Sequence, residues 1–209
     1  MMILLTVGIF AALAGGQQSS CSPVSRPVSI SWSDRAELRS PACKWIVSVN
    51  PDASGQDGPA DLILQNVASD KSHLIAKVNR DAVIHWNPDG NGLLLEDMAY
   101  SDHYRLLLFD PLSESSSESE ATDLDKLIRK QVEENLGTSE NINYLPRYVS
   151  WNRAGLIVSI GVVTIHGSSG PFTPHCYGFK IRVNPLSIAE TLTEGQLKKE
   201  YKASCQIWP

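Results

Sequence analysis

The sequence lacks the residue groupings that mark common metal and redox sites. Its four cysteines show no C-x-x-C spacing, which argues against a zinc site or a thioredoxin-type motif. Its five histidines show neither H-x-H nor H-x-x-x-H spacing, so no metal site is indicated. We therefore predict no cofactor, no metal and no catalytic residue from these patterns.

A strongly basic surface is also missing. The 209 residues carry 18 basic and 23 acidic side chains, and no Lys/Arg cluster is interleaved with aromatic residues. Nucleic acid is therefore not an expected partner. The hydrophobic content of 42% is enough to bury a core, and we expect a single domain over residues 17–209.

Long hydrophobic runs are confined to the N-terminus, where residues 1–13 are almost wholly apolar. This run falls short of the roughly 20 residues that span a bilayer. Small residues follow it, which predicts a secretory signal cut before Gly15 or, as we take it, after residue 16. No Lys or Arg precedes the run, so a membrane anchor or a buried strand is the alternative. The expected location is secreted or periplasmic, with no transmembrane segment after cleavage.

The cysteines are expected to form disulfides in such a compartment, because their number is even. Three connectivities are possible, and a bridge between the two ends of the chain would close a long loop. Four buried free thiols are the alternative. The candidate disulfide residues are Cys21, Cys43, Cys176 and Cys205.

Most of the chain is predicted to form short strands. Apolar and β-branched runs alternate with turn-rich segments and are not separated by helices, which favours antiparallel sheet and an all-β fold. The predicted strands cover residues 44–49, 61–67, 72–78, 81–86, 92–97, 104–110, 155–165 and 177–183.

Residues 112–137 interrupt this pattern. Residues 112–120 are acidic and serine-rich, which predicts a mobile loop. Apolar residues then recur at helical spacing, with Thr122 as the expected N-cap and Gly137 as the stop. We expect an amphipathic helix that packs on the sheet, and a partner-binding helix is the alternative.

Internal repeats are the most informative feature of the sequence. The phrase apolar-x-Trp-Ser/Asn occurs at residues 29–33, 83–87 and 148–152. A tight turn and a new apolar strand follow the second and third copies. An insertion delays the first equivalent, which we place at SPACKWIVSV from Ser40.

The middle copy, Trp86-Asn87-Pro88-Asp89-Gly90 followed by two apolar strands, resembles the β-propeller repeat of the TolB type. Degenerate copies precede and follow it over about residues 28 to 193. The resemblance implies about three antiparallel blades with one inserted helix, and protein partners at the cell envelope. Propellers usually close with four or more blades. The stack is therefore expected to be incomplete or open, and a homodimer through edge strands is one way to cover it.

The turn that begins at Asn87 can also be compared with a calcium loop. An EF-hand loop needs a bidentate acid at its twelfth position, and Met98 stands there. We therefore interpret the segment as a structural hairpin. In it, Pro88 presets the turn, Asp89 caps backbone N–H groups and Gly90 takes a positive φ.

Nucleophilic chemistry has one candidate segment, residues 166–177. Ser168 and Ser169 lie between two glycines that are three residues apart, but a nucleophile elbow needs G-x-S-x-G before a helix. We therefore expect a hairpin loop there, and a small secreted hydrolase using His166 to Tyr177 is the alternative function. His85 is expected to be a strand residue satisfied by neighbouring backbone.

The favoured function is an exported protein-interaction module without catalysis. Aromatic residues in two hairpin loops are the candidate contacts, because aromatic side chains are enriched at interface hot spots. The candidate contact residues are Tyr100, His103, Tyr104, Phe172, His175 and Tyr177.

Overall fold

The structure is a computed structural model. The predicted leader, residues 1–16, lies outside the part of the chain that it describes. The described residues are 28–30, 35–51, 59–100, 103–137, 142–165, 173–203 and 205.

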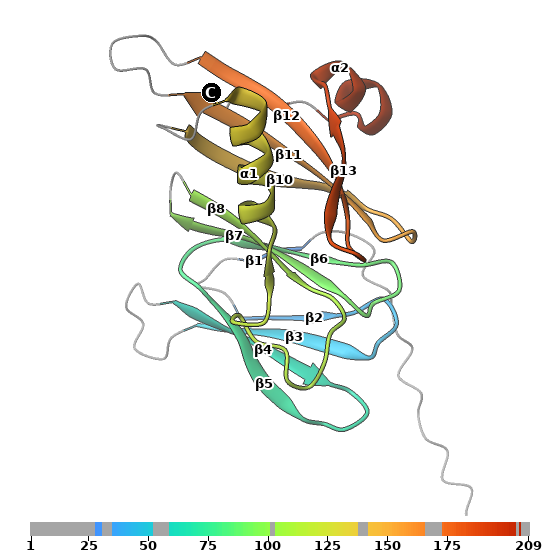
Figure 1. Cartoon of the computed structure of the whole chain (residues 1–209). Helices are drawn as coiled ribbons and strands as arrows, with labels where there is room; N and C mark the ends of the chain where they lie inside the picture. The colour runs from blue at the N-terminus through green and yellow to red at the C-terminus, as the bar shows by residue number, and fades with distance from the viewer. Residues whose placement is uncertain are drawn as a thin grey trace, which may run out of the picture.

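The described residues form thirteen strands in three antiparallel sheets (Figure 1). The first sheet holds β2 (Ala36–Arg39), β3 (Trp45–Asn50), β4 (Ala60–Asn66) and β5 (Ser72–Val78). The middle sheet holds β6 (Ala82–Trp86), β7 (Leu93–Tyr100), β8 (His103–Phe109) and β9 (Thr122–Asp123), with β1 (Val28–Ile30) beside β6. The last sheet holds β10 (Ile142–Trp151), β11 (Leu156–Ile165), β12 (Thr173–Arg182) and β13 (Ser187–Leu192).

Four consecutive strands are neighbours in each sheet, so each sheet is built as an up-and-down meander. The all-β prediction is confirmed, and the eight predicted strands correspond to β3 to β8, β11 and β12. Four strands of the meanders, β2, β9, β10 and β13, were not on that list. β2 and β9 are short and β13 is polar, and only the end of β10 carried a signal, the Trp phrase at residues 148–152.

The middle sheet is buried on both of its faces. Leu93 and Leu95 belong to the apolar core shared with the first sheet, whereas Leu94 belongs to the core shared with the last sheet. All three side chains have no exposed surface. Because neighbouring residues of a strand point to opposite faces, only a strand covered on both sides buries three leucines in a row.

Helix α1 (Leu124–Leu136) packs against this second core through its apolar face, as predicted. Leu124, Ile128 and Val132 have no exposed surface. Gly137 ends the helix with a φ of 65°, as expected. The N-cap is Asp123 rather than Thr122, and its carboxylate accepts hydrogen bonds from the first-turn N–H groups of Asp125 and Lys126. Thr122 is instead part of β9, which pairs with β8.

Residues 112–120, which were predicted to be a mobile loop, make contacts with the first and middle sheets. Leu112 is 8% exposed and lies in the first core. The Glu114 carboxylate accepts a hydrogen bond from Ser69 Oγ at 2.7 Å and pairs with Lys71 Nζ at 3.1 Å. The serine-rich and acidic composition suggested a solvated loop, but the glutamate side chains accept hydrogen bonds from groups on β5 and on the loop before it.

The C-terminus adds a helical segment that was not predicted. α2 (Glu194–Gln196) and the π-helical turn η1 (Leu197–Tyr201) cover the outer face of the last sheet, where Leu197 is fully buried. The Thr193 side chain accepts from the backbone N–H of Gln196, and the Gln196 side chain accepts from the backbone N–H of Thr193. This capping box, Thr-x-x-Gln, was the sequence signal for the segment.

One disulfide, Cys176–Cys205, ties this C-terminal segment to β12. Cys43 is also disulfide-bonded, and Cys21 lies outside the described residues. The prediction of disulfides is therefore confirmed for three of the four cysteines. The bridge that would join Cys176 or Cys205 to the N-terminal cysteines is excluded, because these two cysteines bond to each other.

The first two strands of each meander are joined by the same turn, and we call residues 40–43, 87–90 and 152–155 the motif turns. The fourth residue of each has a positive φ: 53° at Cys43, 68° at Gly90 and 71° at Gly155. In each, the backbone N–H of the fourth residue donates to the carbonyl of the first, at 2.8, 3.0 and 3.1 Å. Ala42-Cys43 thus takes the place in the first motif turn that Asp89-Gly90 takes in the middle one.

The capping side chain of the middle motif turn is Asn87, and the prediction that Asp89 caps it is wrong. Asn87 Oδ1 accepts a hydrogen bond from the backbone N–H of Asn91 at 2.8 Å. Asn152 plays the same role in the last motif turn, where its Oδ1 accepts from the N–H of Leu156 at 3.0 Å. The first position of the turn carries the cap because its side chain folds back over the residues that follow.

Candidate functional site

The predicted contact residues that the structure describes lie on the strands of two hairpins, β7–β8 and β11–β12. Tyr100 pairs with His103 at the end of β7 and β8, and Ile165 pairs with Thr173 at the end of β11 and β12. Figure 1 shows both hairpin ends on the same side of the molecule, opposite the motif turns. A meander requires this, because successive turns alternate between its two ends. Phe172 and the side chains of Tyr100, His103 and Tyr104 lie outside the described part.

The other two contact residues belong to a row of rings on β12. The His175 and Tyr177 ring centroids lie 6.3 Å apart, and those of Tyr177 and Phe179 also lie 6.3 Å apart. Alternate residues of a strand share one face, which produces this ladder. Phe179 is fully buried in the second core, and Tyr177 packs against that core. His175 and Tyr177 are half-buried, so the ladder runs from the core to the hairpin end.

A charged cluster that the sequence did not predict lies between the middle and last sheets. Glu96 on β7 lies with one oxygen 3.2 Å from His85 Nε2 on β6 and pairs through the other with Arg147 Nε on β10. His85 is 6% exposed and Glu96 is 3% exposed. The prediction that backbone satisfies His85 is therefore wrong, since a carboxylate does. The sequence signal was Glu96 itself, an acid that directly follows a buried strand segment.

Tyr148 closes the cluster from the last sheet. Its ring stacks on His85 with centroids 3.8 Å apart and planes 26° apart. Burial raises the pKa of the Tyr148 phenol, and a hydrogen bond with the Trp151 backbone partly offsets that rise. The cluster therefore places a hydrogen-bonded polar contact inside an otherwise apolar junction between two sheets.

A second charged cluster connects the middle sheet to the serine-rich segment. Arg105 Nε donates to Asp97 Oδ2 at 3.1 Å, and its Nη1 donates to Glu118 Oε1 at 2.9 Å. Burial alone would lower the pKa of the Arg105 guanidinium, but the hydrogen bonds and charges of Asp97 and Glu118 outweigh it and raise that pKa. Asp97 has no exposed surface.

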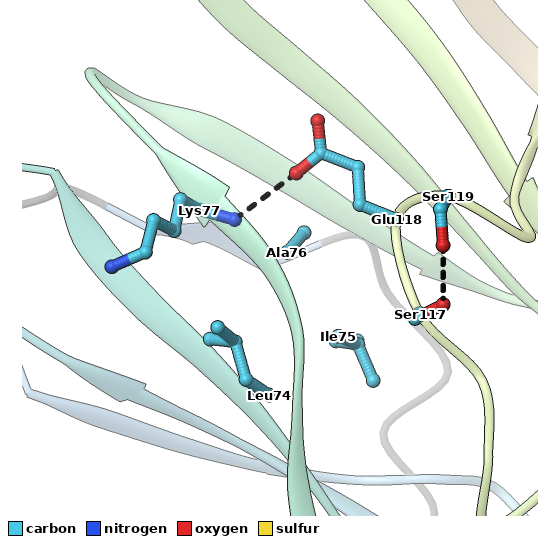
Figure 2. A pocket seen from close by; sticks show the side chains of 7 residues that line it. All are labelled: Leu74, Ile75, Ala76, Lys77, Ser117, Glu118 and Ser119. Carbon is cyan, nitrogen blue, oxygen red and sulfur yellow. Dashed lines mark hydrogen bonds between the residues drawn. The ribbon is translucent and has the colours of Figure 1, made fainter.

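A shallow groove of about 290 Å³ lies between β5 and the serine-rich segment. Figure 2 shows Leu74 and Ile75 on the strand side and the Ser117–Ser119 hydrogen bond on the other. The backbone N–H of Lys77 donates to Glu118 Oε2 at 3.4 Å across this groove. The groove is therefore bridged by a side chain of the segment that lines it.

The two charged clusters have the geometry of structural contacts. His85, Glu96 and Asp97 are nearly or fully buried, so a dissolved substrate does not reach them without separation of the sheets. Among the described residues, no group of three or more His, Cys, Asp or Glu side chains is placed to hold a metal ion. His166, Ser168 and Ser169 lie outside these residues, so the hydrolase alternative stays a prediction.

Comparison of the chain with protein-family models, with curated proteins and with solved structures gave no match. In the described part of the chain, no helix has the length and apolar character needed to cross a bilayer.

Proposed function

We propose that this chain is an exported protein-interaction module without catalytic activity, acting as a secreted or periplasmic protein. Its contact surface is formed by the ends of the β7–β8 and β11–β12 hairpins. The observation that carries the proposal is the ring ladder of His175, Tyr177 and Phe179, which extends from the second core to one of these ends.

The ladder provides what an interface anchor needs. Phe179 is immobilised in the core, and Tyr177 packs on the same core while a part of its surface remains exposed. An aromatic side chain that is already held in place loses little conformational freedom when a partner binds. Tyrosine at a central, well-packed position is also a common hot-spot residue. In this proposal the ring ladder on β12 is therefore a preorganised platform for a protein contact.

The three sheets are, in this proposal, three blades of an open propeller-like stack of the TolB type. Two observations support this interpretation. Each sheet is a four-strand meander, and in each meander a motif turn of the same hydrogen-bonding pattern joins the first two strands. Partners at the cell envelope are inferred from that resemblance, which carries fold-level weight only.

Export is supported by the disulfide chemistry. Cys176 and Cys205 form a disulfide and Cys43 is bonded as well, which is expected in an oxidising compartment. The apolar run at residues 1–13 provides a leader for that route.

The hydrolase alternative has less support. In the described part of the chain, His175 stacks on a tyrosine ring and pairs with no carboxylate. A histidine that serves as general base needs such a partner or a nucleophile within hydrogen-bond reach.

The test is capture of a partner by the purified protein and by two pairs of variants. Phe172→Ala with Tyr177→Ala removes the proposed surface. Val67→Ala with Leu186→Ala is the matched control, because these side chains are 42% and 41% exposed and lie in turns outside the proposed surface. Circular dichroism checks that each variant keeps its fold.

The proposal is supported by a partner that binds the wild type and the control equally but binds the Phe172/Tyr177 double variant at least about tenfold more weakly. That factor corresponds to the loss of a hot-spot contact. Equal binding by both pairs contradicts the proposed surface. Hydrolysis of an ester or glycoside that is lost on His175→Ala would favour the hydrolase instead.

A further inference from the structure

The two faces of β12 make different contacts. The ring ladder lies on the face toward the second core, whereas Cys176 packs on the outer face, against the cluster that contains Leu192 and Leu197. Alternate residues of a strand share a face, so Gly178 and Lys180 lie on the outer face with Cys176. The strand that carries the ladder is therefore also contacted from its back.

The C-terminal segment makes these contacts, and we call α2, η1 and Cys205 together the C-terminal clasp. A Cβ on Gly178 would lie 2.6 Å from Leu197 Cδ2, so the absence of a side chain there leaves room for this buried leucine. Lys180 Nζ lies 3.5 Å from Glu200 Oε2. The clasp is thus fitted to the outer face of β12.

Within the described ranges, the half of β12 nearest the hairpin end is paired with a strand on one side alone. β11 pairs with β12 along its whole length, but β13 pairs with it only from Arg182 to Gly178, where Leu192 lies opposite. Residues 173–177, which carry two rings of the ladder, extend beyond β13. A two-stranded hairpin without further support is only marginally stable.

The disulfide lies at this half of β12. Cys176 stands between His175 and Tyr177 in the chain. Cys205 Sγ lies 3.6 Å from the carbonyl oxygen of Gly161, the residue of β11 that pairs with Tyr177. The end of the clasp therefore contacts both strands of the hairpin beside the two rings.

We propose that the C-terminal clasp, through the Cys176–Cys205 disulfide, holds this half of β12 and keeps the rings of His175 and Tyr177 in the arrangement that binds a partner. The bond supplies the support that β13 does not reach far enough to give. The partner-binding role of the rings rests on the proposed function, whereas the effect of the clasp on their mobility does not. Cys176 and Cys205 are positioning residues, because they act through the rings.

The experiment compares the wild type with two variants of the full-length chain. Cys176→Ala with Cys205→Ala, the double cysteine variant, removes the bond and keeps Leu197. Leu197→Ala is the matched control, because it removes a buried contact of the same clasp and keeps the bond. Urea unfolding establishes how far each variant is destabilised.

Two measurements report on the rings and their strand without a partner. Nuclear magnetic resonance gives the ring-proton shifts of Tyr177, which the neighbouring rings displace from the values of an exposed tyrosine. In the double cysteine variant these shifts should move toward the exposed values. Amide hydrogen exchange in residues 175–177, relative to residues 179–182, should accelerate there at least about tenfold, which is less than a disulfide usually contributes. Leu197→Ala should leave both measurements near the wild-type values.

A third measurement uses the partner captured in the test of the proposed function. Its affinity for the double cysteine variant should be about three- to tenfold weaker than for the wild type or Leu197→Ala, because freed rings must be ordered on binding. Failure to capture any partner would contradict the proposed function, and the ring shifts and the exchange rates would still decide whether the clasp holds the rings.

Three results overturn the proposal. Unchanged ring shifts and exchange in the double cysteine variant would mean that pairing with β11 is sufficient. Equal changes in Leu197→Ala would mean that general loosening of the sheet, and not the bond, controls the rings. A captured partner that binds the double cysteine variant as tightly as the wild type would remove the positioning role.

A second route applies if the double cysteine variant does not fold. Folded wild type is treated with dithiothreitol, which is oxidised to its cyclic disulfide as Cys176 and Cys205 become thiols. The same measurements are then made on the reduced protein. Exchange in β2 and β3 separates the effect of reducing the bond at Cys43, which lies in the turn between them.

Discussion

The backbone of Gly90 lies directly against the amide nitrogen of Ala42, so that a Cβ on Gly90 would stand 2.8 Å from it. These two residues belong to neighbouring motif turns, which Asn91 and Lys44 also connect by a side-chain hydrogen bond of 3.3 Å. Gly92 lies in the same way against the Trp151 ring, beside the last motif turn. The motif turns therefore touch from sheet to sheet, along the right-hand side of Figure 1.

We predict that Gly90→Ala destabilises the protein more than Gly155→Ala. Both glycines have a positive φ, which costs an alanine about 1–2 kcal/mol. Gly155 has open space around it, whereas Gly90 would also push its Cβ into backbone, adding about 1–3 kcal/mol. Urea unfolding of the two variants measures the difference. Equal losses would show that the close approach to Ala42 relaxes without cost.

We predict that Glu96→Leu lowers the free energy of unfolding by about 3–5 kcal/mol, because it leaves His85 buried and Arg147 partly buried without their carboxylate. Glu120→Leu, at an exposed position, should change it by about 0.5 kcal/mol or less. Adding Arg147→Met to Glu96→Leu should recover part of the loss. A loss below about 1 kcal/mol for Glu96→Leu contradicts a stabilising role of the cluster.

The Glu114 carboxyl should titrate below the pH 4.5 of an unperturbed glutamate, since a hydrogen bond from Ser69 and then the contact with Lys71 lower its pKa. A lowered folded-state pKa stabilises the protein above pH 4.5, and that contribution is lost as the pH falls through the folded value. Nuclear magnetic resonance titration should show the midpoint rising in Ser69→Ala and in Lys71→Ala. Lys126→Ala, on α1, is the control that should leave it unchanged. A midpoint of 4.5 or higher in the wild type contradicts the contacts of Glu114 with Ser69 and Lys71.

We predict that replacing Cys176 and Cys205 together by alanine lowers the stability by about 3–4 kcal/mol, on the chain-entropy estimate for a loop of this length. Amide hydrogen exchange in α2 and η1 should become faster than in the strands of the last sheet, because the disulfide holds this helical segment against them. Hydrogen exchange measures this locally and urea unfolding measures it globally. Unchanged exchange in residues 194–203 would mean that packing of Leu197 alone holds the segment.

Local patterns in the sequence identified most elements. β-Branched and apolar runs located eight strands, and the spacing of Leu124, Ile128 and Val132 located α1 with its C-terminal stop at Gly137. The repeated Trp-to-turn phrase located the second and third motif turns, and the turn-and-strand pattern from Ser40 located the first. These signals lie within a few residues of one another, so backbone preference and side-chain periodicity were sufficient to find them.

The sites required contacts between distant segments. His85, Glu96 and Arg147 come from three strands, and only the approach of the last sheet to the middle one unites them. Residues 112–120 were predicted to be mobile from their composition, yet Ser69, Lys71 and Arg105 supply them with hydrogen-bond donors that no local pattern reveals. The contact roles of the β7–β8 hairpin side chains and of Phe172 remain predictions.

The sequence by itself determined an all-β chain of repeated meanders with one amphipathic helix, because strand and turn preferences are local. Tertiary structure decided which cysteines bond, which acids are buried, and that the middle sheet is covered on both faces. The run Leu93 to Leu95 carries both kinds of information. Its apolar character predicts a buried strand, but only the packing of a sheet on each side explains why all three leucines are inaccessible to solvent.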